Sequence, residues 1–328
     1  QIGPLNNENY LTQQTICGKF QEENSLLQNT KNVSSQNDSF LVRISVILWN
    51  NPQITKALKL IVLVGISEAI CLLSTKKEYS TSTKNRIKAE KRFNEWLAGL
   101  IDGDGNFYVS KEGWSVGLEI TMDLRDEHCL YIIKQKYGGS IKLRSGAKAV
   151  RYRLLHKDGL IALIQDINGN IRNPIRIEQL KKVCLKYEIE VKEPIALEYS
   201  NGWLSGFFDA DGNISIHKEN NVIIIAITQK DKEMLEPLEK LYGGKIYVHN
   251  KKKTVYKWTI FIKEEIDLIN KNYFHINPSR SKKSVRLNLI DKFNELKELK
   301  CHLAEKDTIL GRAWKHLETK WNEGFKVE

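Results

Sequence analysis

The stretch that decides the fold is WLAGLIDGDG at residues 96–105, because it returns as WLSGFFDADG at residues 203–212. Two further landmarks repeat in the same order. Tyr-Gly-Gly occurs at 137–139 and 242–244, and Asn-Pro-x-Arg occurs at 173–176 and 277–280. Landmarks that recur in one order indicate an internal repeat, and each copy has roughly one hundred residues, enough for one compact unit.

Each copy predicts a motif helix followed by strands. The helix is expected to end at the glycine after its second aspartate, since glycine is the usual helix stop. In residues 114–121 every second side chain is apolar, which is the period of a half-buried strand. Similar alternation predicts strands at 140–144, 149–155, 213–217, 245–249 and 255–260, with Val248 among the apolar positions, and helices at 160–167 and 264–270.

These elements predict an α+β fold of two pseudo-symmetric lobes. Each lobe would be a curved antiparallel sheet with helices on one face, and the two motif helices would pack together at the lobe interface. We expect the first lobe at residues 89–188, the second at 189–300 and a C-terminal helical tail at 301–328. The tail should pack on the second lobe, because its apolar residues recur at helical spacing: Leu310, Trp314, Leu317 and Trp321.

Residues 1–88 differ in composition and are predicted to be an N-terminal extension. Residues 21–38 are rich in Asn, Gln and Ser, which is typical of disorder. The apolar run at 60–73 contains Glu68 and is shorter than the ~20 residues of a spanning helix, so we expect no stable membrane insertion. Residues 81–92 are polar and basic and suggest a linker. The five cysteines lie far apart without a CxxC pair and indicate reduced thiols.

The polar faces of the predicted strands indicate a partner. The chain has 51 Lys and Arg against 40 Asp and Glu, a formal charge of +11, which favours polyanions such as nucleic acid. Polar and basic side chains alternate with the apolar ones in both copies, and we predict DNA contact over simple solvation. These residues are Lys142, Arg144, Arg151, Arg153, Asn213, Ser215, His217, Lys245, Tyr247, His249, Lys257 and Thr259.

The motif itself indicates a close helix pair with an acidic end. Gly99 and Gly103 are spaced four apart, as are Gly206 and Ala210, so each helix carries a stripe of small residues. Glycine inside a helix costs ~1 kcal/mol against alanine, and close backbone approach would offset that cost. Each helix then ends in an aspartate facing the negative end of the helix dipole. Two such carboxylates side by side would attract a divalent cation such as Mg²⁺.

Residues 97–105 and 204–212 resemble the signature of the LAGLIDADG homing endonucleases, and the likeness in architecture covers roughly residues 93–300. The resemblance implies metal-assisted hydrolysis of both strands of a DNA duplex, with Asp104 and Asp211 as the catalytic acids. It implies a metal site that also includes Gly103 and Ala210, taking Mg²⁺ or another divalent cation such as Mn²⁺ or Ca²⁺. The first acids of the two motifs are expected to be structural.

Further catalytic candidates follow from the resemblance and the repeat. Gln229 is a candidate beside the metal-bound water, although the first copy departs from it with Met122-Asp123-Leu124-Arg125. Arg176 and Arg280 stand at matching positions of the repeat and are candidates for contacts to the scissile phosphates. Two further basic residues are DNA-binding candidates, with surface solvation as the alternative: Lys282 and Lys283.

Three functions remain open on the sequence. A site-specific homing endonuclease would act as a monomer on a long asymmetric DNA target and promote intron mobility. An RNA maturase would instead bind its host intron RNA and assist splicing. An inert DNA-binding module is disfavoured, because both second acids are present. The abundance of Lys, Asn and Ile, whose codons are AT-rich, suggests an organellar reading frame and a mitochondrial or other organellar matrix location.

Overall fold

The computed structural model describes residues 84–111, 115–250, 254–323 and 325. All of the described residues except residue 84 belong to one compact unit, residues 85–328. The Asn- and Ser-rich segment and the apolar runs of the predicted N-terminal extension lie outside the described residues. Within the part of the chain that is described, no helix is both long enough and apolar enough to cross a bilayer.

The first lobe begins with a helix at residues 84–104, which carries the first motif. The segment predicted as a linker at 81–92 is therefore helical from residue 84 onward, and its Lys, Arg, Ala and Glu residues favour helix. The lobe continues through β1 (Gly105–Val109), β2 (Val116–Asp123), α4 (Glu127–Tyr137), β3 (Ser140–Leu143), β4 (Ala149–Leu154), α5 (Lys157–Ile167) and α6 (Pro174–Lys186).

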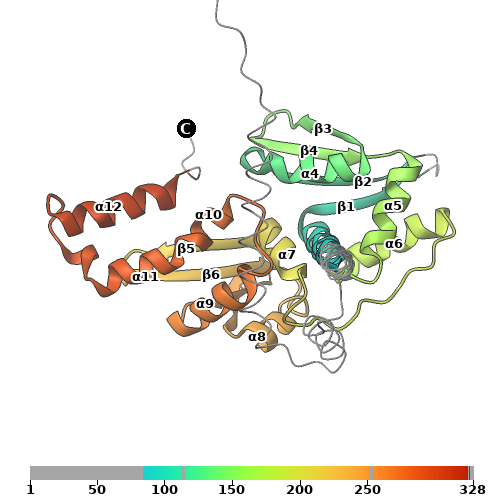
Figure 1. The fold of residues 1–328 in the computed structure, drawn as a ribbon. Helices are drawn as coiled ribbons and strands as arrows, with labels where there is room; N and C mark the ends of the chain where they lie inside the picture. The colour runs from blue at the N-terminus through green and yellow to red at the C-terminus, as the bar shows by residue number, and fades with distance from the viewer. Residues whose placement is uncertain (1–83, 112–114, 251–253, 324, 326–328) are drawn as a thin grey trace, which may run out of the picture. The chain divides into compact units, whose positions relative to one another are not determined.

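The second lobe repeats this order and then adds a helical tail. Its elements are α7 (Trp203–Asp211), β5 (Gly212–His217), β6 (Val222–Gln229), α8 (Glu236–Tyr242), β7 (Lys245–Asn250), β8 (Val255–Ile260), α9 (Lys263–Ile269), a π-helical segment (Asn270–Phe274), α10 (Lys283–Asn288), α11 (Ile290–Glu298) and α12 (Ile309–Asn322). Figure 1 shows α7 and the first motif helix, drawn in cyan, lying between the two sheets.

The two sheets have the same topology. Their strand orders are β1-β2-β4-β3 and β5-β6-β8-β7, with every neighbouring pair antiparallel. The registers also match, because Gly105 pairs with Ile120 and Gly212 pairs with Ile227 at the point where each motif helix enters its sheet. The predicted α+β fold of two pseudo-symmetric lobes is confirmed.

Alternation in the strands follows the predicted pattern at most positions, but Leu143 of β3 is 70% exposed, and Val248 and Thr259 also depart from it. Leu118, Ile120 and Met122 of β2 are buried, whereas the polar residues between them are partly exposed. The pattern predicts Val248 on the apolar face, but its side chain is 53% exposed, because the pairing of β7 with β8 is irregular between Val248 and Asn250. The pattern also predicts that Thr259 faces DNA, but Thr259 is only 9% exposed, since it lies in β8 between β6 and β7.

The C-terminal helix packs on the second lobe. The Trp314 and Trp321 rings lie 5.5 and 6.3 Å from the Phe293 ring of α11, and the Arg286 guanidinium donates to the Trp321 carbonyl at 2.9 Å. Leu310 departs from the predicted apolar stripe, since it is 45% exposed near the start of α12. These contacts attach α12 to α10 and α11.

Candidate active site

The small-residue stripes bring the two motif helices into backbone contact. A Cβ atom on Gly99 would overlap the carbonyl oxygen of Trp203, and one on Gly206 would overlap the carbonyl oxygen of Trp96. Near the other end of the helices, a Cβ on Gly103 would lie 2.8 Å from Oδ2 of Asp211. The helices therefore touch along their length, and the Asp211 carboxylate lies against the last turn of the opposite helix.

Asp104 and Asp211 are the last residues of their helices, and their carboxylates interact electrostatically. Burial and, to a smaller extent, the negative charge of Asp211 raise the pKa of Asp104 to about 7, while Lys283 and Arg176 oppose the shift. Burial also raises the pKa of Asp211, with Lys283 and Gln229 opposing. Two partly desolvated carboxylates this close favour either a shared proton or a bound cation.

Gln229 makes the two acids unequal. Its side-chain amide donates to Oδ2 of Asp211 at 2.5 Å. Gln229 lies two residues beyond Ile227 on β6, and the matching position on β2, two residues beyond Ile120, is the buried Met122. Asp104 therefore has no such amide at the equivalent place, and this departure between the two copies of the sequence becomes a chemical difference between the lobes.

Two basic residues lie at the ends of the motif helices. Nζ of Lys283 donates to the carbonyl oxygens of Phe208, Asp209 and Ala210 at 2.9, 2.7 and 3.2 Å. The Arg176 guanidinium lies 3.5 Å from the carbonyl oxygen of Gly103. A cation at a helix C-terminus stabilises the exposed carbonyls and the dipole. Lys283 is one of the residues that the sequence predicts to contact DNA, and the structure anchors its Nζ on these carbonyls near the two acids.

Burial lowers the pKa of Lys283, and four nearby carboxylates, including Asp104 and Asp211, counteract that shift. Another of the four is Asp126, which accepts a hydrogen bond from the Lys282 backbone at 2.7 Å and whose own pKa is raised by burial. Asp126 belongs to none of the three repeated landmarks, so the sequence did not single it out.

The structure places the Arg280 guanidinium in a different setting from that of Arg176, which lies beside the Gly103 carbonyl. The Arg280 guanidinium lies 4.9 Å from the Trp96 ring, and the Arg280 backbone N–H donates to Asp209 at 2.8 Å. In the first lobe Arg172 makes the equivalent contacts, over the Trp203 ring and to Asp102. These contacts align Arg280 with Arg172, whereas the shared Asn-Pro-x-Arg sequence aligns it with Arg176, four residues later.

The helix starts explain this offset. In the first lobe Pro174 is the first residue of α6. In the second lobe the matching Pro278 precedes a loop, and α10 begins only at Lys283. By position in the fold, Arg172 corresponds to Arg280, and Arg176 corresponds to Lys283. The Asn-Pro-x-Arg sequence that the two lobes share does not reveal this difference in loop length.

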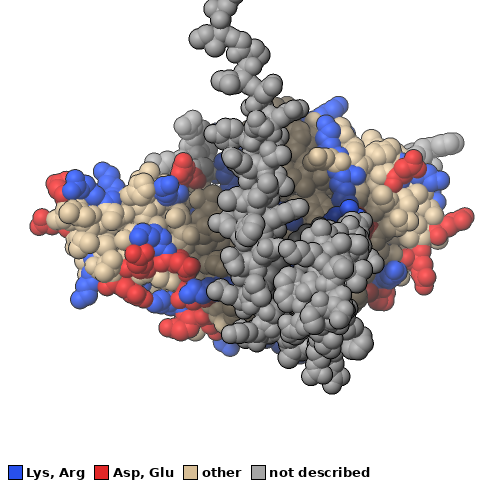
Figure 2. Space-filling model, viewed as in Figure 1, with Lys and Arg blue, Asp and Glu red and all other residues tan. Residues whose placement is uncertain are grey.

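The residues predicted to contact DNA have unequal access. The exposed ones are Lys142, Arg144, Arg153, Asn213, His217, Lys245, Tyr247 and His249, and the partly buried ones are Arg151, Ser215, Lys257 and Lys282. Arg153 and Arg151 approach Glu119 of β2 at 2.6 and 3.6 Å, so an acid that the sequence did not single out offsets two of these charges. Figure 2 shows basic and acidic side chains interspersed on the face in view, so net charge does not locate the interface.

The donor set suits a hard divalent cation. Asp104 and Asp211 offer carboxylate oxygens, and the neighbouring Gly103 and Ala210 offer backbone carbonyls, each facing one basic side chain as well. Mg²⁺ commonly binds through one or two carboxylates and completes its shell with water and phosphate oxygens. In the described part of the chain no cluster of three or more His, Cys, Asp or Glu side chains could hold a metal ion. The site therefore fits a cation shared with a phosphate ligand.

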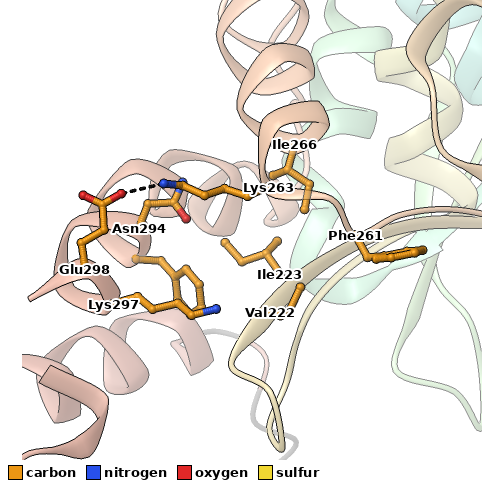
Figure 3. A pocket seen from close by; sticks show the side chains of 9 residues that line it. Val222, Ile223, Phe261, Lys263, Ile266, Asn294, Lys297 and Glu298 are labelled. Atoms are coloured by element: carbon orange, nitrogen blue, oxygen red, sulfur yellow. Dashed lines mark hydrogen bonds and ion pairs between the residues drawn. The ribbon is translucent and has the colours of Figure 1, made fainter. Parts of the chain in front are cut away.

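A separate pocket lies on the second lobe, between the start of β6 and helices α9 and α11. It has a volume of about 350 Å³ and is mostly apolar, with Ile223, Phe261 and Ile266 in its wall. Figure 3 shows the Lys263–Glu298 ion pair, 2.6 Å long, at its rim. Neither acid of the motif lines this pocket, so it is distinct from the candidate active site.

Comparison with known proteins identifies the family. The profile of the LAGLIDADG endonucleases matches residues 97–184 and 204–294, which are the two repeats. This chain belongs to the LAGLIDADG endonuclease family. It is 45% identical over 253 residues to the intron-encoded RNA maturase bI4 of Saccharomyces cerevisiae, which covers 76% of this chain and 39% of the maturase. Intron-encoded DNA endonuclease ai2b of Dictyostelium discoideum is 38% identical over 246 residues, covering 72% of this chain and 92% of that protein.

A further relative and a solved structure agree with this assignment. The probable intron-encoded endonuclease aI2 of Debaryomyces hansenii is 38% identical over 260 residues, 74% of this chain and 39% of that protein. The chain thus spans about two fifths of the maturase and of aI2. Among solved structures, the LAGLIDADG homing endonuclease I-LtrWI bound to target DNA superimposes with a TM-score of 0.55 at 18% identity, covering 71% of this chain and 98% of that one.

Proposed function

We propose that this chain is a site-specific DNA endonuclease of the homing type, which makes a divalent-metal-dependent double-strand break and promotes intron mobility. The observation that carries the proposal is the pair of carboxylates, Asp104 and Asp211, held together at the ends of two helices in backbone contact. The Dictyostelium relative, named a DNA endonuclease and matched over 92% of its length, supports the same activity.

The residues of the site have separate tasks in this mechanism. Asp104 and Asp211, with the carbonyls of Gly103 and Ala210 beside them, would hold the cation. A bound Mg²⁺, or Mn²⁺ or Ca²⁺ in the same site, would supply activation of water and neutralisation of charge on the phosphate. The Gln229 amide fixes the Asp211 carboxylate and favours its charged form.

Arg176 and Lys283 add positive charge beside the two acids. Lys283 is anchored by three carbonyls and lies close enough to influence the acids, so it would stabilise the negative charge that develops on the scissile phosphate. Arg176 would do so in the first lobe. Arg280 is not assigned a catalytic task, because its guanidinium lies over the Trp96 ring.

The polar faces of the two sheets would bind the duplex. Base edges in the major groove can be read by side chains from a sheet, and the exposed strand residues of both lobes supply such side chains. The lobes differ at matching positions, since Arg151 and Arg153 of β4 have Lys257 and the buried Thr259 of β8 as counterparts. The target would therefore be long and asymmetric, bound by one copy of the chain. The intron-encoded relatives suggest an organelle, such as the mitochondrial matrix, as the place of action.

The test is cleavage of DNA that carries the intron-free insertion site, with Mg²⁺ and with EDTA. The wild type should cut both strands only with the cation, and Asp104→Asn and Asp211→Asn should each lose at least about a hundredfold in rate. Asp307→Asn, an exposed acid in a loop, serves as the control and should cut normally. A wild type that binds this DNA but never cuts it would overturn the proposal.

The second candidate is an RNA maturase, and one observation favours it. The relative that is 45% identical over 253 residues is named an RNA maturase. RNA binding would not require either acid, so the presence of both favours cleavage. Tight binding to the host intron RNA by a protein that cannot cut DNA would select the maturase function.

A further inference from the structure

Two tryptophan side chains cross between the motif helices. The indole N–H of Trp96 donates to Asp209 at 2.8 Å, and the indole N–H of Trp203 donates to Asp102 at 2.7 Å. All four side chains are buried, with exposed fractions of 1 to 3%. Each bond links the start of one repeated stretch to the end of the other, so the pair forms a reciprocal connection across the lobe interface.

Each aspartate in this pair has further partners in its own lobe. Asp102 accepts hydrogen bonds from the backbone N–H groups of Arg172 and Asn173 at 2.8 and 3.1 Å. Asp209 accepts one from the backbone N–H of Arg280 at 2.8 Å, and two serine hydroxyls also donate to it. Each of these two aspartates therefore joins its own helix, the tryptophan of the other helix and the loop that precedes α6 or α10.

An arginine completes each arrangement. The Arg280 guanidinium lies 4.9 Å from the Trp96 ring, and the Arg172 guanidinium lies 5.7 Å from the Trp203 ring, both within cation–π range. We call Trp96, Asp209 and Arg280 the first corner, and Trp203, Asp102 and Arg172 the second corner. No residue of either corner has a part in the proposed chemistry of cleavage.

The corners supply what the small-residue stripes lack. Contact between glycine-rich surfaces brings helices close, but it has no direction and does not fix how far one helix slides along the other. Hydrogen bonds are directional, and two reciprocal ones oppose sliding in either sense. Asp102 and Asp209 each lie two residues before a motif acid, a rise of about 3 Å along the helix. A shift at either corner would therefore move the neighbouring carboxylate.

We propose that the two corners are positioning devices that set the separation of the Asp104 and Asp211 carboxylates, with Trp96 fixing the end of the second motif helix and Trp203 fixing the end of the first. The inference rests on the proposed DNA cleavage for one of its two tests. The lobes are related by a pseudo-two-fold axis, as are the strands of a duplex, so each acid serves chiefly one strand. Loss of one indole N–H then slows one strand more than the other.

The variants Trp96→Phe and Trp203→Phe isolate this role. Each keeps an aromatic ring beneath the arginine and removes only the N–H donor. Trp258→Phe is the matched control, because Trp258 is also fully buried and its indole donates to the Gly243 carbonyl at 2.8 Å, within the second lobe and outside both motif helices. All three variants lose one buried indole hydrogen bond, so a general loss of stability affects all of them.

The first measurement needs no activity. Titration with CaCl₂, followed by the rise in melting temperature, gives an apparent Ca²⁺ affinity for each variant of the full chain. Trp96→Phe and Trp203→Phe should bind Ca²⁺ several-fold more weakly than the wild type, and Trp258→Phe should match the wild type. Equal Ca²⁺ affinity in all three variants would overturn the inference.

The second measurement follows each DNA strand separately under single-turnover conditions with Mg²⁺. Trp96→Phe and Trp203→Phe should slow opposite strands by about tenfold or more, while affinity for DNA in Ca²⁺ stays near the wild-type value. Both variants slowing the same strand, or both strands equally, would overturn the inference. A wild type that fails to cut would refute the proposed function alone, since the Ca²⁺ titration still decides whether the corners position the acids.

Discussion

Gly99 faces the backbone carbonyl of Trp203 so closely that no side chain fits between the two helices. The reciprocal contact, between Gly206 and the carbonyl of Trp96, has the same geometry. Glycine in a helix interior is less favourable than alanine by ~1 kcal/mol, so two such residues weaken the isolated helices. Their presence is explained by the backbone contact, which places the two acids side by side.

Gly99→Ala and Gly206→Ala should each destabilise the protein, although alanine is the better helix former. The added methyl group overlaps a backbone carbonyl that cannot rotate away, and overpacking of this kind costs about 1–3 kcal/mol or more. Urea unfolding measures the free energy of unfolding directly. In Gly146→Ala the new Cβ would meet open space, and only the strain of a φ of 73° remains, about 1–2 kcal/mol. A Gly99→Ala protein as stable as the wild type would contradict the backbone contact.

The free energy of unfolding without divalent cations should fall as pH rises from about 5 to 8. Burial raises the pKa of Asp104 from 3.8 to about 7, and burial raises that of Asp102 to about 7 as well. Between these values the folded protein holds protons that the unfolded chain has released, so stability is present at low pH and lost through pH 7. Within this pH range each group lowers the free energy of unfolding by on the order of 1 kcal/mol for every pH unit.

Urea unfolding in EDTA at pH 5.5 and pH 8 tests this dependence. Asp104→Asn should show a smaller difference between the two pH values than the wild type, because one proton-binding group has been removed. Added Ca²⁺ should stabilise the wild type more at pH 8 than at pH 5.5, since the cation competes with protons for the carboxylates. An Asp104→Asn protein with the full wild-type slope would place the responsible group elsewhere.

Much of the fold and the two central acids were predictable because their signals are local. Alternation of apolar residues in β2 needs only neighbouring positions, and the repeat fixes how many lobes there are. The aspartates that end the two motif helices, Asp104 and Asp211, are marked by the glycines around them. Close approach of helices can be inferred from small residues alone, so the juxtaposition of the acids followed from the sequence.

The surroundings of the acids were less predictable because they depend on tertiary structure. The loop before α10 is longer than that before α6, which moves Lys283 rather than Arg280 to the place of Arg176. The shared Asn-Pro-x-Arg letters conceal this difference. The bonds from Trp96 and Trp203 to the opposite helix were also hidden, although both residues open the repeated stretch and were a usable signal.

Gln229→Met should weaken cation binding most at acidic pH. Its amide donates to Asp211 and favours the charged carboxylate, so its loss raises the Asp211 pKa. The pH midpoint of Ca²⁺ binding, followed by thermal shift, should rise by on the order of one unit. The variant copies the first lobe, where Met122 stands at this position. Met122→Leu conserves volume and should leave the midpoint unchanged; an equal shift in both variants would assign the effect to packing.

Glu119→Gln should strengthen binding to DNA in a salt-dependent manner. Glu119 lies on β2 between the guanidinium groups of Arg153 and Arg151, at 2.6 and 3.6 Å, and therefore offsets positive charge on the polar face of the first sheet. Removal of that negative charge leaves both arginines free to pair with phosphates, and each added phosphate contact steepens the salt dependence of affinity by about 0.9 in the log–log slope.

Binding of duplex DNA in Ca²⁺ at several salt concentrations tests this expectation. Glu119→Gln should bind more tightly at low salt and lose more affinity as salt rises, and random-sequence DNA should gain as much as the specific target, because phosphate contacts carry no sequence information. Glu178→Gln is the control, since Glu178 is an exposed acid that pairs with Lys181 at 2.9 Å on α6 and contacts neither Arg151 nor Arg153. If Glu119→Gln left the slope unchanged while Arg153→Gln reduced affinity, Arg153 would already be contacting phosphate in spite of its acidic neighbour.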